Sequence, residues 1–215
     1  MSLNVQYLFV HTAAADIRNV DRDVIDRWHR DRGWAGIGYH YVILDDRHDR
    51  KADGTIEVGR PETRSGAHVL HLNSVSIGIC CAGHGDRRPL TAAQMRSLVG
   101  LLADLCQKYK LAPDRILGHR EVNRLADMGL APPEARTSKS CPGTRVDCDA
   151  IRAAVQTELA QRAGAPVQAE PSPEALEALR QAIAIIQKHE ALLGNARDEW
   201  RSFLGSGEVH GILGR

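Results

Sequence analysis

The sequence predicts an α/β domain with a mixed central β-sheet flanked by helices, followed by a C-terminal helical tail. Short apolar runs rich in β-forming residues alternate with amphipathic segments, which is the pattern of strands interleaved with helices. The 215 residues are 43% hydrophobic, enough to build a buried core. These observations exclude a chain that is disordered throughout.

Five short runs are expected to be strands. They lie at residues 5–10, 38–44, 55–58, 74–81 and 115–118. The first is an apolar run of β-formers that stops at His11. The third follows an Asp53-Gly54 turn, so it is expected to pair with the second. The fourth is β-branched and apolar, and the last is too short to be a helix.

Three segments have the apolar spacing of amphipathic helices. They cover residues 21–32, 91–105 and 148–161. Asn19 or Asp21 can cap the first helix, which stops at Gly33, and Thr91 can cap the second. Residues 163–173 are rich in proline and small residues and indicate a linker. We therefore expect a catalytic domain over residues 1–162 and a separate tail over residues 174–215.

The tail is expected to form one amphipathic helix of about five turns. Its apolar residues recur at spacings of 3, 4 and 3: Leu176, Leu179, Ile183 and Ile186. Such a stripe is expected to be covered, either by the catalytic domain or by the same helix of another chain. Self-association through this helix is the prediction, and no further role is assigned to the tail.

Composition limits which binding partners and which cellular compartment are expected. The 28 basic and 27 acidic side chains give a net charge of +1, which provides no electrostatic footprint for nucleic acid. No apolar run approaches the roughly 18 residues of a membrane span. The first residues lack the pattern of a signal peptide, so synthesis in the cytoplasm is expected. Five cysteines in a reducing compartment argue against a disulfide framework.

Three side chains form a candidate metal site. His11 and His119 each follow a short apolar strand, and Cys141 lies in a loop further along the chain. Strand ends are where sites gather in α/β folds, and two imidazoles with a thiolate are good zinc ligands. Spacing alone leaves the structural alternative open, because a strand-end histidine or a lone cysteine is more often a packed side chain than a ligand.

Six sequence blocks in order carry a family resemblance. They are Phe9-Val10-His11, Trp28-His29 with Gly33-Trp34 leading into Gly38-Tyr39-His40-Tyr41, Gly66-Ala67-His68, Asn73-Ser74-Val75-Ser76-Ile77-Gly78, Gly118-His119-Arg120-Glu121-Val122 and Lys139-Ser140-Cys141-Pro142-Gly143. Together they resemble the zinc-dependent N-acetylmuramoyl-L-alanine amidases, which include phage amidase-type lysozymes and the related peptidoglycan recognition proteins. The resemblance covers residues 5–160 and not the tail.

The resemblance implies a role for each site residue. His11, His119 and Cys141 are expected to bind zinc, which lowers the pKa of water from about 15.7 toward about 7. Tyr39 and Lys139 are expected to be the catalytic pair, supplying donors to the oxyanion that forms during amide hydrolysis. His68 is expected to contact substrate or a ligand. A structural role is expected for His40, and none is assigned to His29, His48, His71, His84, His189 or His210.

The expected function is hydrolysis of the amide between N-acetylmuramic acid and L-alanine, by a phage or prophage endolysin acting on the cell wall after release. Recycling amidases of the same family carry a glutamate and an aspartate where this chain has Cys80 and Cys141, so the sequence favours the lytic type. Two alternatives remain. One is a non-catalytic muropeptide-binding module, and the other is a regulatory module that acts through a protein partner.

Overall fold

The computed structural model describes residues 3–164 as a continuous chain. Beyond them it describes isolated helical positions: Glu174, Glu177, Arg180, Gln181, Ala184, Ile185, Lys188 and His189. The predicted apolar stripe at Leu176, Leu179, Ile183 and Ile186 lies outside the described residues. Among the helices that are described, none has the length and apolar character required to cross a bilayer.

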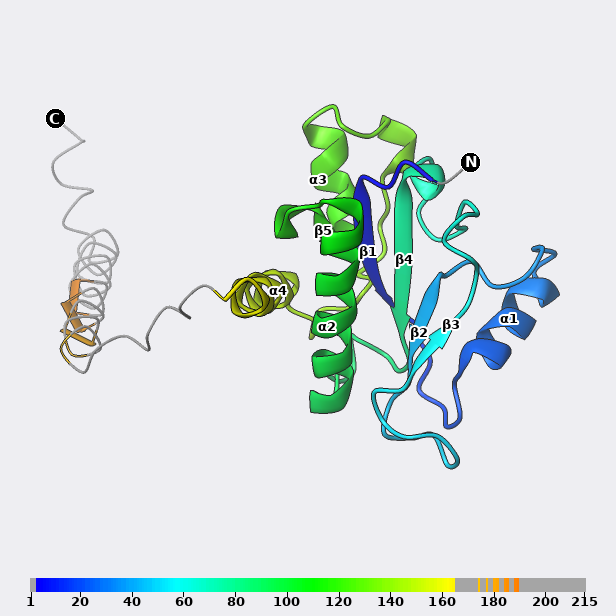
Figure 1. The fold of residues 1–215 in the computed structure, drawn as a ribbon, viewed down its shortest axis with the longest axis horizontal. Coiled ribbons are helices and arrows are strands. Elements are labelled where there is room, and N and C mark those ends of the chain that lie inside the picture. The colour runs from blue at the N-terminus through cyan, green and yellow to red at the C-terminus, as the bar shows by residue number, and fades with distance from the viewer. Residues whose placement is uncertain are drawn as a thin grey trace, which may run out of the picture. The chain divides into compact units, whose positions relative to one another are not determined.

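A five-stranded mixed sheet forms the centre of the domain (Figure 1). Its strands are β1 (Tyr7–Thr12), β2 (Tyr41–Ile43), β3 (Ile56–Val58), β4 (Ser76–Cys81) and β5 (Ile116–Gly118). Their spatial order is β3-β2-β4-β1-β5. β1 runs parallel to both of its neighbours, β4 and β5, and β2 also runs parallel to β4. β3 is antiparallel to β2 at one edge, so the predicted mixed sheet is confirmed.

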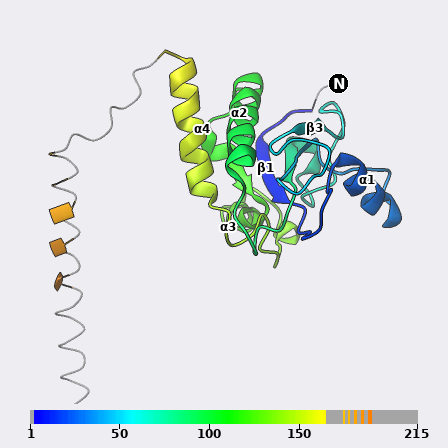
Figure 2. The same ribbon diagram turned by 90° about the horizontal axis from the view of Figure 1, so that it is seen from below.

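Helices cover the two faces of this sheet (Figures 1 and 2). They are α1 (Arg22–Asp31), α2 (Ala92–Tyr109), α3 (Val122–Asp127) and α4 (Cys148–Arg162). Leu8 and Val10 of β1 pack in one core cluster with α2 and α4. Phe9 lies on the opposite face, in a cluster that includes α3. Because side chains alternate along a strand, His11 is on the same face of β1 as Phe9.

The helix starts follow the capping residues expected from sequence. Asp21 accepts a hydrogen bond from Val24 N at the start of α1. Thr91 begins α2 with a reciprocal capping box, in which its hydroxyl accepts from Gln94 N and Gln94 Oε1 accepts from Thr91 N. α2 ends at Lys110 in the left-handed conformation, with φ of 55°.

Three segments differ from the sequence-based expectation. The first strand was expected to stop at His11, but β1 continues through His11 to Thr12, so this histidine lies within the strand. Residues 73–75 form a 3-10 turn rather than the start of a strand, because Asn73 Oδ1 accepts hydrogen bonds from His68 N and Val69 N at 2.7 and 3.0 Å. The short helix α3 was not expected. It follows β5 through a turn at His119–Glu121, and Val122 and Leu125 are its buried residues.

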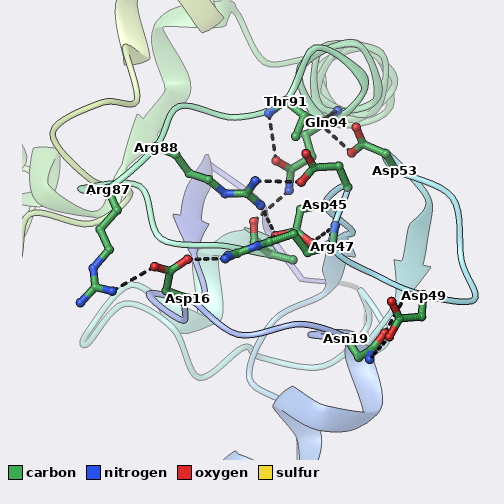
Figure 3. Close-up of polar contacts among 12 residues, drawn as sticks. Asp16, Asn19, Asp45, Arg47, Asp49, Asp53, Arg87, Arg88, Thr91 and Gln94 are labelled. Atoms are coloured by element: carbon green, nitrogen blue, oxygen red, sulfur yellow. Dashed lines mark hydrogen bonds and ion pairs between the residues drawn. The ribbon is translucent and has the colours of Figure 1, made fainter.

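A buried carboxylate braces the loops that follow β1, β2 and β4 (Figure 3). Asp45 is 1% exposed and accepts hydrogen bonds from the Arg47 and Arg88 guanidinium groups. Arg47 also pairs with Asp16, which Arg87 contacts at 3.0 Å. A buried charge is tolerated when it is paired in this way. The network holds together three loops at the carboxyl ends of these parallel strands, on the side of the sheet where the candidate site lies.

Candidate metal centre and active site

His11, His119 and Cys141 converge at the carboxyl ends of β1 and β5. One donor atom from each lies within 4.8 Å of the other two. His11 Nδ1 is 3.5 Å from Cys141 Sγ, and the rings of His11 and His119 meet edge to face at 4.9 Å between centroids. The structure therefore brings together the three side chains that the sequence singled out.

The two histidines are placed by the sheet. His11 is the fifth residue of β1, opposite Cys80 of β4, and its side chain is buried. His119 directly follows β5. The turn that holds His119 is fixed by Glu121, which accepts from Gly118 N at 2.7 Å and pairs with Arg152 at 3.0 Å. Both imidazoles are thus attached to hydrogen-bonded strand ends.

Cys141 lies on a loop that is bonded to the rest of the site at several points. Arg120 N donates to Cys141 O at 2.7 Å, and the Arg120 guanidinium donates to the carbonyls of Ser140, Gly143 and Val146. Thr12 Oγ1 donates to Pro142 O at 2.8 Å. The residues adjacent to His11 and His119 in sequence therefore also hold the loop that carries the third donor.

A second loop supports the Cys141 loop from the side. Asp86 accepts from Ser140 Oγ and from Thr144 N, both at 2.7 Å. Gly85 approaches so closely that a Cβ placed on it would lie 1.8 Å from Pro142 O. Glycine is needed here because any side chain would collide with backbone.

His68 contacts the candidate ligand His11. Its Nδ1 lies 3.2 Å from His11 Nε2, and its side chain is largely buried. His40 packs on the His68 ring edge to face, and His40 itself accepts from Gly78 N while its Nε2 lies 3.1 Å from Arg64 O. His40 is thus held by backbone groups on both nitrogens, as expected of a structural residue.

Tyr39 packs against His11, with ring centroids 5.1 Å apart. His29 of α1 supports it from the other side, because the His29 ring lies 5.5 Å from that of Tyr39 and its Nδ1 accepts from Gly38 N at 2.9 Å. No role was expected for His29, and sequence position alone does not reveal a contact made across the fold. Burial, with the nearby thiols of Cys80 and Cys141, raises the pKa of Tyr39 well above its usual value, so the phenol stays protonated.

Lys139 is exposed and lies with His119 on the wall of a groove of about 360 Å³. His68 also lines this groove, and Trp34 and Leu70 contribute exposed apolar surface to it. The groove therefore opens beside the cluster of His11, His119 and Cys141. All six site residues predicted from sequence lie in or next to this region.

The electrostatics of the cluster keep its imidazoles neutral. Burial, together with the charge of Lys139, lowers the pKa of His119 to about 4. Burial also lowers the pKa of His11 well below its usual value, with His68, His119 and Lys139 acting in the same direction. Burial raises the pKa of the Cys141 thiol, while a hydrogen bond from Thr12 N and the charge of Lys139 oppose that rise.

Two neutral imidazoles and a thiol within reach of one ion, beside a phenol and an ammonium group, define a candidate metallohydrolase centre. The N-acetylmuramoyl-L-alanine amidase family model matches residues 1–144. The chain therefore belongs to the N-acetylmuramoyl-L-alanine amidase family, and it is an enzyme of that class.

Individual relatives agree with this assignment. The endolysin of Escherichia phage T7 is 40% identical over 121 residues, which are 54% of this chain and 74% of that protein. Peptidoglycan-recognition protein SC2 of Drosophila melanogaster is 34% identical over 140 residues, 64% of each chain. Among solved structures, the N-acetylmuramoyl-L-alanine amidase LysC from Clostridium intestinale superposes with a TM-score of 0.58 at 29% identity, covering 72% of this chain and 87% of its own.

Proposed function

We propose that this amidase is zinc-dependent, that His11, His119 and Cys141 hold the ion, and that the protein acts as a phage or prophage endolysin. The convergence of these three side chains from distant parts of the chain carries the proposal. The donor set fits zinc, because it offers two neutral imidazoles and one thiol, and a catalytic site uses three protein ligands. The contact between His68 and His11 also fits a zinc site, because a histidine ligand usually has its second ring nitrogen hydrogen-bonded to a partner.

The residues around the cluster have separate tasks in amide hydrolysis. Zinc, when bound, lowers the pKa of water and acts as a Lewis acid. The Tyr39 phenol, protonated at neutral pH, donates a hydrogen bond to the oxyanion that develops when the amide carbonyl becomes tetrahedral. Lys139 adds a positive charge beside the same position. The groove next to His119 holds the substrate on the side of Lys139.

The proposed substrate is peptidoglycan, cut between N-acetylmuramic acid and the L-alanine of the stem peptide. The likeness to the phage T7 endolysin, 40% identical over 121 residues, supports a lytic role, with synthesis in the cytoplasm and action on the cell wall after release. We also propose that residues 1–162 form the catalytic domain, followed by a linker over residues 163–173 and a tail over residues 174–215. Every proposed site residue lies in the first of these.

Mass spectrometry of purified peptidoglycan after digestion tests the reaction. We expect free stem peptides with an N-terminal L-alanine, and we expect the chelator-treated protein to release none. Cys141→Ala should lose both bound zinc and activity. Cys106→Ala, which removes a thiol on α2 outside the cluster, is the matched control and should keep both.

Two results would contradict the proposal. Full zinc occupancy in Cys141→Ala would remove this residue from the ligand set. Binding of muropeptides without any cleavage, by protein that contains zinc, would show that the chain is a recognition module rather than an enzyme.

A further inference from the structure

The groove beside the cluster is lined by cationic and apolar side chains. Arg136 and Lys139 lie on its lining, and among the described residues that line it there is no carboxylate. Trp34 and Leu70, 42% and 62% exposed, supply apolar surface in the same groove. A groove with cationic and apolar surface suits a ligand that carries negative charge on an otherwise uncharged backbone.

Arg136 is held in place by the segment between α3 and the Cys141 loop. Its neighbour Ala135 is 2% exposed and packs in the core cluster with Leu125. On the other side, Asn123 bonds both backbone groups of Thr137, donating to its carbonyl and accepting from its N–H at 2.9 Å each. The backbone that carries Arg136 is therefore anchored at both of its neighbours.

The Arg136 guanidinium is also oriented and remains available. It pairs with Asp127, and its side chain is 47% exposed. An exposed ion pair of this kind is screened by solvent and contributes little to stability. A ligand carboxylate can therefore share the guanidinium with Asp127 or replace it, and a guanidinium binds carboxylates with two parallel N–H donors.

The two halves of the proposed substrate differ in charge. The glycan on one side of the scissile amide is uncharged at N-acetylmuramic acid, where the lactyl carboxyl is itself the amide. The stem peptide on the other side continues after L-alanine with a glutamate linked through its side chain, which leaves an α-carboxyl group free. That α-carboxylate is the first negative charge on the peptide side of the bond that is cut.

We propose that Arg136 binds this α-carboxylate and makes the enzyme selective for stem peptides in which it is not amidated. The inference rests on the proposed function, because it assumes cleavage next to L-alanine. It assigns the groove to the stem peptide and gives the segment between α3 and the Cys141 loop a role in substrate choice. Lys139 lies on the same lining. In this arrangement Lys139 stabilises the charge on the reacting carbonyl, and Arg136 binds the carboxylate one residue further along the peptide.

The test combines a charge change in the substrate with a charge change in the enzyme. The substrates are N-acetylmuramoyl-L-alanyl-D-isoglutamyl-L-lysine and its isoglutamine counterpart, which differ only in the α-carboxyl group. The zinc-loaded wild type should cleave the free acid with a kcat/KM about tenfold higher, mainly through a lower KM, as expected for one charge-assisted contact. Arg136→Gln should cleave both substrates with similar kcat/KM.

Matched variants separate this contact from a general effect of charge. Arg96→Gln removes the same charge from an exposed position on α2 and should keep the tenfold preference. Arg136→Lys should keep part of it, because lysine retains the charge without the two parallel donors. The Arg136→Gln protein should retain the zinc content of the wild type.

The outcomes are distinguishable from failure of the proposed function. Equal cleavage of the two substrates by the wild type, or an unchanged preference in Arg136→Gln, would overturn the role of Arg136 while leaving the amidase intact. Absence of cleavage of both substrates by zinc-loaded wild type would instead contradict the proposed function.

Discussion

His11 is contacted at both nitrogens of its ring. Nδ1 faces Cys141 Sγ at 3.5 Å, and Nε2 lies 3.2 Å from His68 Nδ1. If Nδ1, the nitrogen that faces Cys141, binds the ion, the ring proton belongs on Nε2 and His68 Nδ1 accepts it. A partner of this kind fixes the tautomer and the ring orientation of a ligand. His68 therefore has a second task besides lining the groove.

Tyr39 and Lys139 provide a test of catalysis separate from metal binding. Tyr39→Phe and Lys139→Ala remove one donor and one charge beside the reacting carbonyl, and neither residue belongs to the donor cluster. We expect both variants to keep zinc and to bind muropeptide, with kcat reduced about 10²-fold or more, the scale of losing one oxyanion donor. Single-turnover rates and metal analysis on the same samples check this. Unchanged turnover in both variants would leave these residues with structural roles only.

At the scale of elements, the Cys141 loop depends on close backbone contact with Gly85. A methyl group on Gly85 would overlap Pro142 O, so Gly85→Ala must displace one of the two loops. We expect the variant to stay folded and to bind zinc at least tenfold more weakly, because ligand placement tolerates little movement. The control is Gly100→Ala on α2, where an added Cβ meets no atom within 4 Å. That control should bind zinc normally and be more stable by about 0.5–1 kcal/mol.

Gly85→Ala with wild-type zinc affinity would show that the loop contact is not needed to place Cys141. Competition with a chromophoric chelator gives the affinities of both variants on one scale. Circular dichroism establishes that each remains folded.

The turn after β5 gives a pH-dependent contribution to stability. Burial by itself would raise the pKa of Glu121, but hydrogen bonds from Arg152 and from Gly118 N outweigh it and lower the pKa. A carboxyl with a lowered folded-state pKa stabilises the protein above its unfolded pKa, and this contribution is lost as pH falls through the folded value. Glu121→Gln should therefore be less stable by about 1–2 kcal/mol at pH 7. The difference from wild type should shrink as the pH falls below about 4.

Urea unfolding of wild type and Glu121→Gln, both without metal, measures this difference at several pH values. A difference that stays constant from neutral to acid pH would assign the effect to packing instead of to the carboxylate charge.

Element positions were largely predictable, because local signals decide them. The Asp21 and Thr91 caps mark helix starts in the sequence and in the structure. The turn at Asn73–Val75 was not predicted, since it depends on the Asn73 side chain bonding the backbone N–H groups of His68 and Val69 in the preceding loop. The short helix α3 has too few residues to show an amphipathic period.

In the site, too, features carried by the local sequence were predictable, and features that depend on tertiary contacts were not. The candidate ligands stood out because each follows a strand or belongs to a motif block. The contacts that hold these ligands in place could not be recognised in the sequence. Arg120 binds carbonyls more than twenty residues away, and His29 packs on Tyr39 from a different element. The segment Leu125–Thr137, between the second and third proposed ligands, was expected from sequence to border the groove, and it does so at Arg136, but the sequence assigned no role to this residue.

For the whole molecule, the separation of catalysis from the tail can be tested by truncation. A chain ending at Arg162 contains every proposed site residue and the last helix of the domain, α4. We expect it to bind zinc and to hydrolyse soluble muropeptides at the rate of the full chain. If the tail self-associates as the apolar spacing predicts, light scattering should give a smaller multiple of the chain mass after truncation.

Each half of this prediction can fail independently. An unchanged number of chains per particle would remove the self-association hypothesis. Loss of zinc binding or activity in the truncated protein would show that the tail contributes to the catalytic domain.

The proposed ligands are far apart in the sequence, so binding of the ion is coupled to folding of the chain. Cys141 and His11 are 130 residues apart in sequence and meet only when the sheet and its loops are assembled. Closing a loop of that length in an unfolded chain costs about 4 kcal/mol plus a constant, so the unfolded protein is a poor chelator. An ion that binds only the folded state stabilises it by about 4 kcal/mol at a thousandfold excess over its Kd. Zinc supply should therefore set how long the enzyme survives heat and proteolysis, as well as how fast it works.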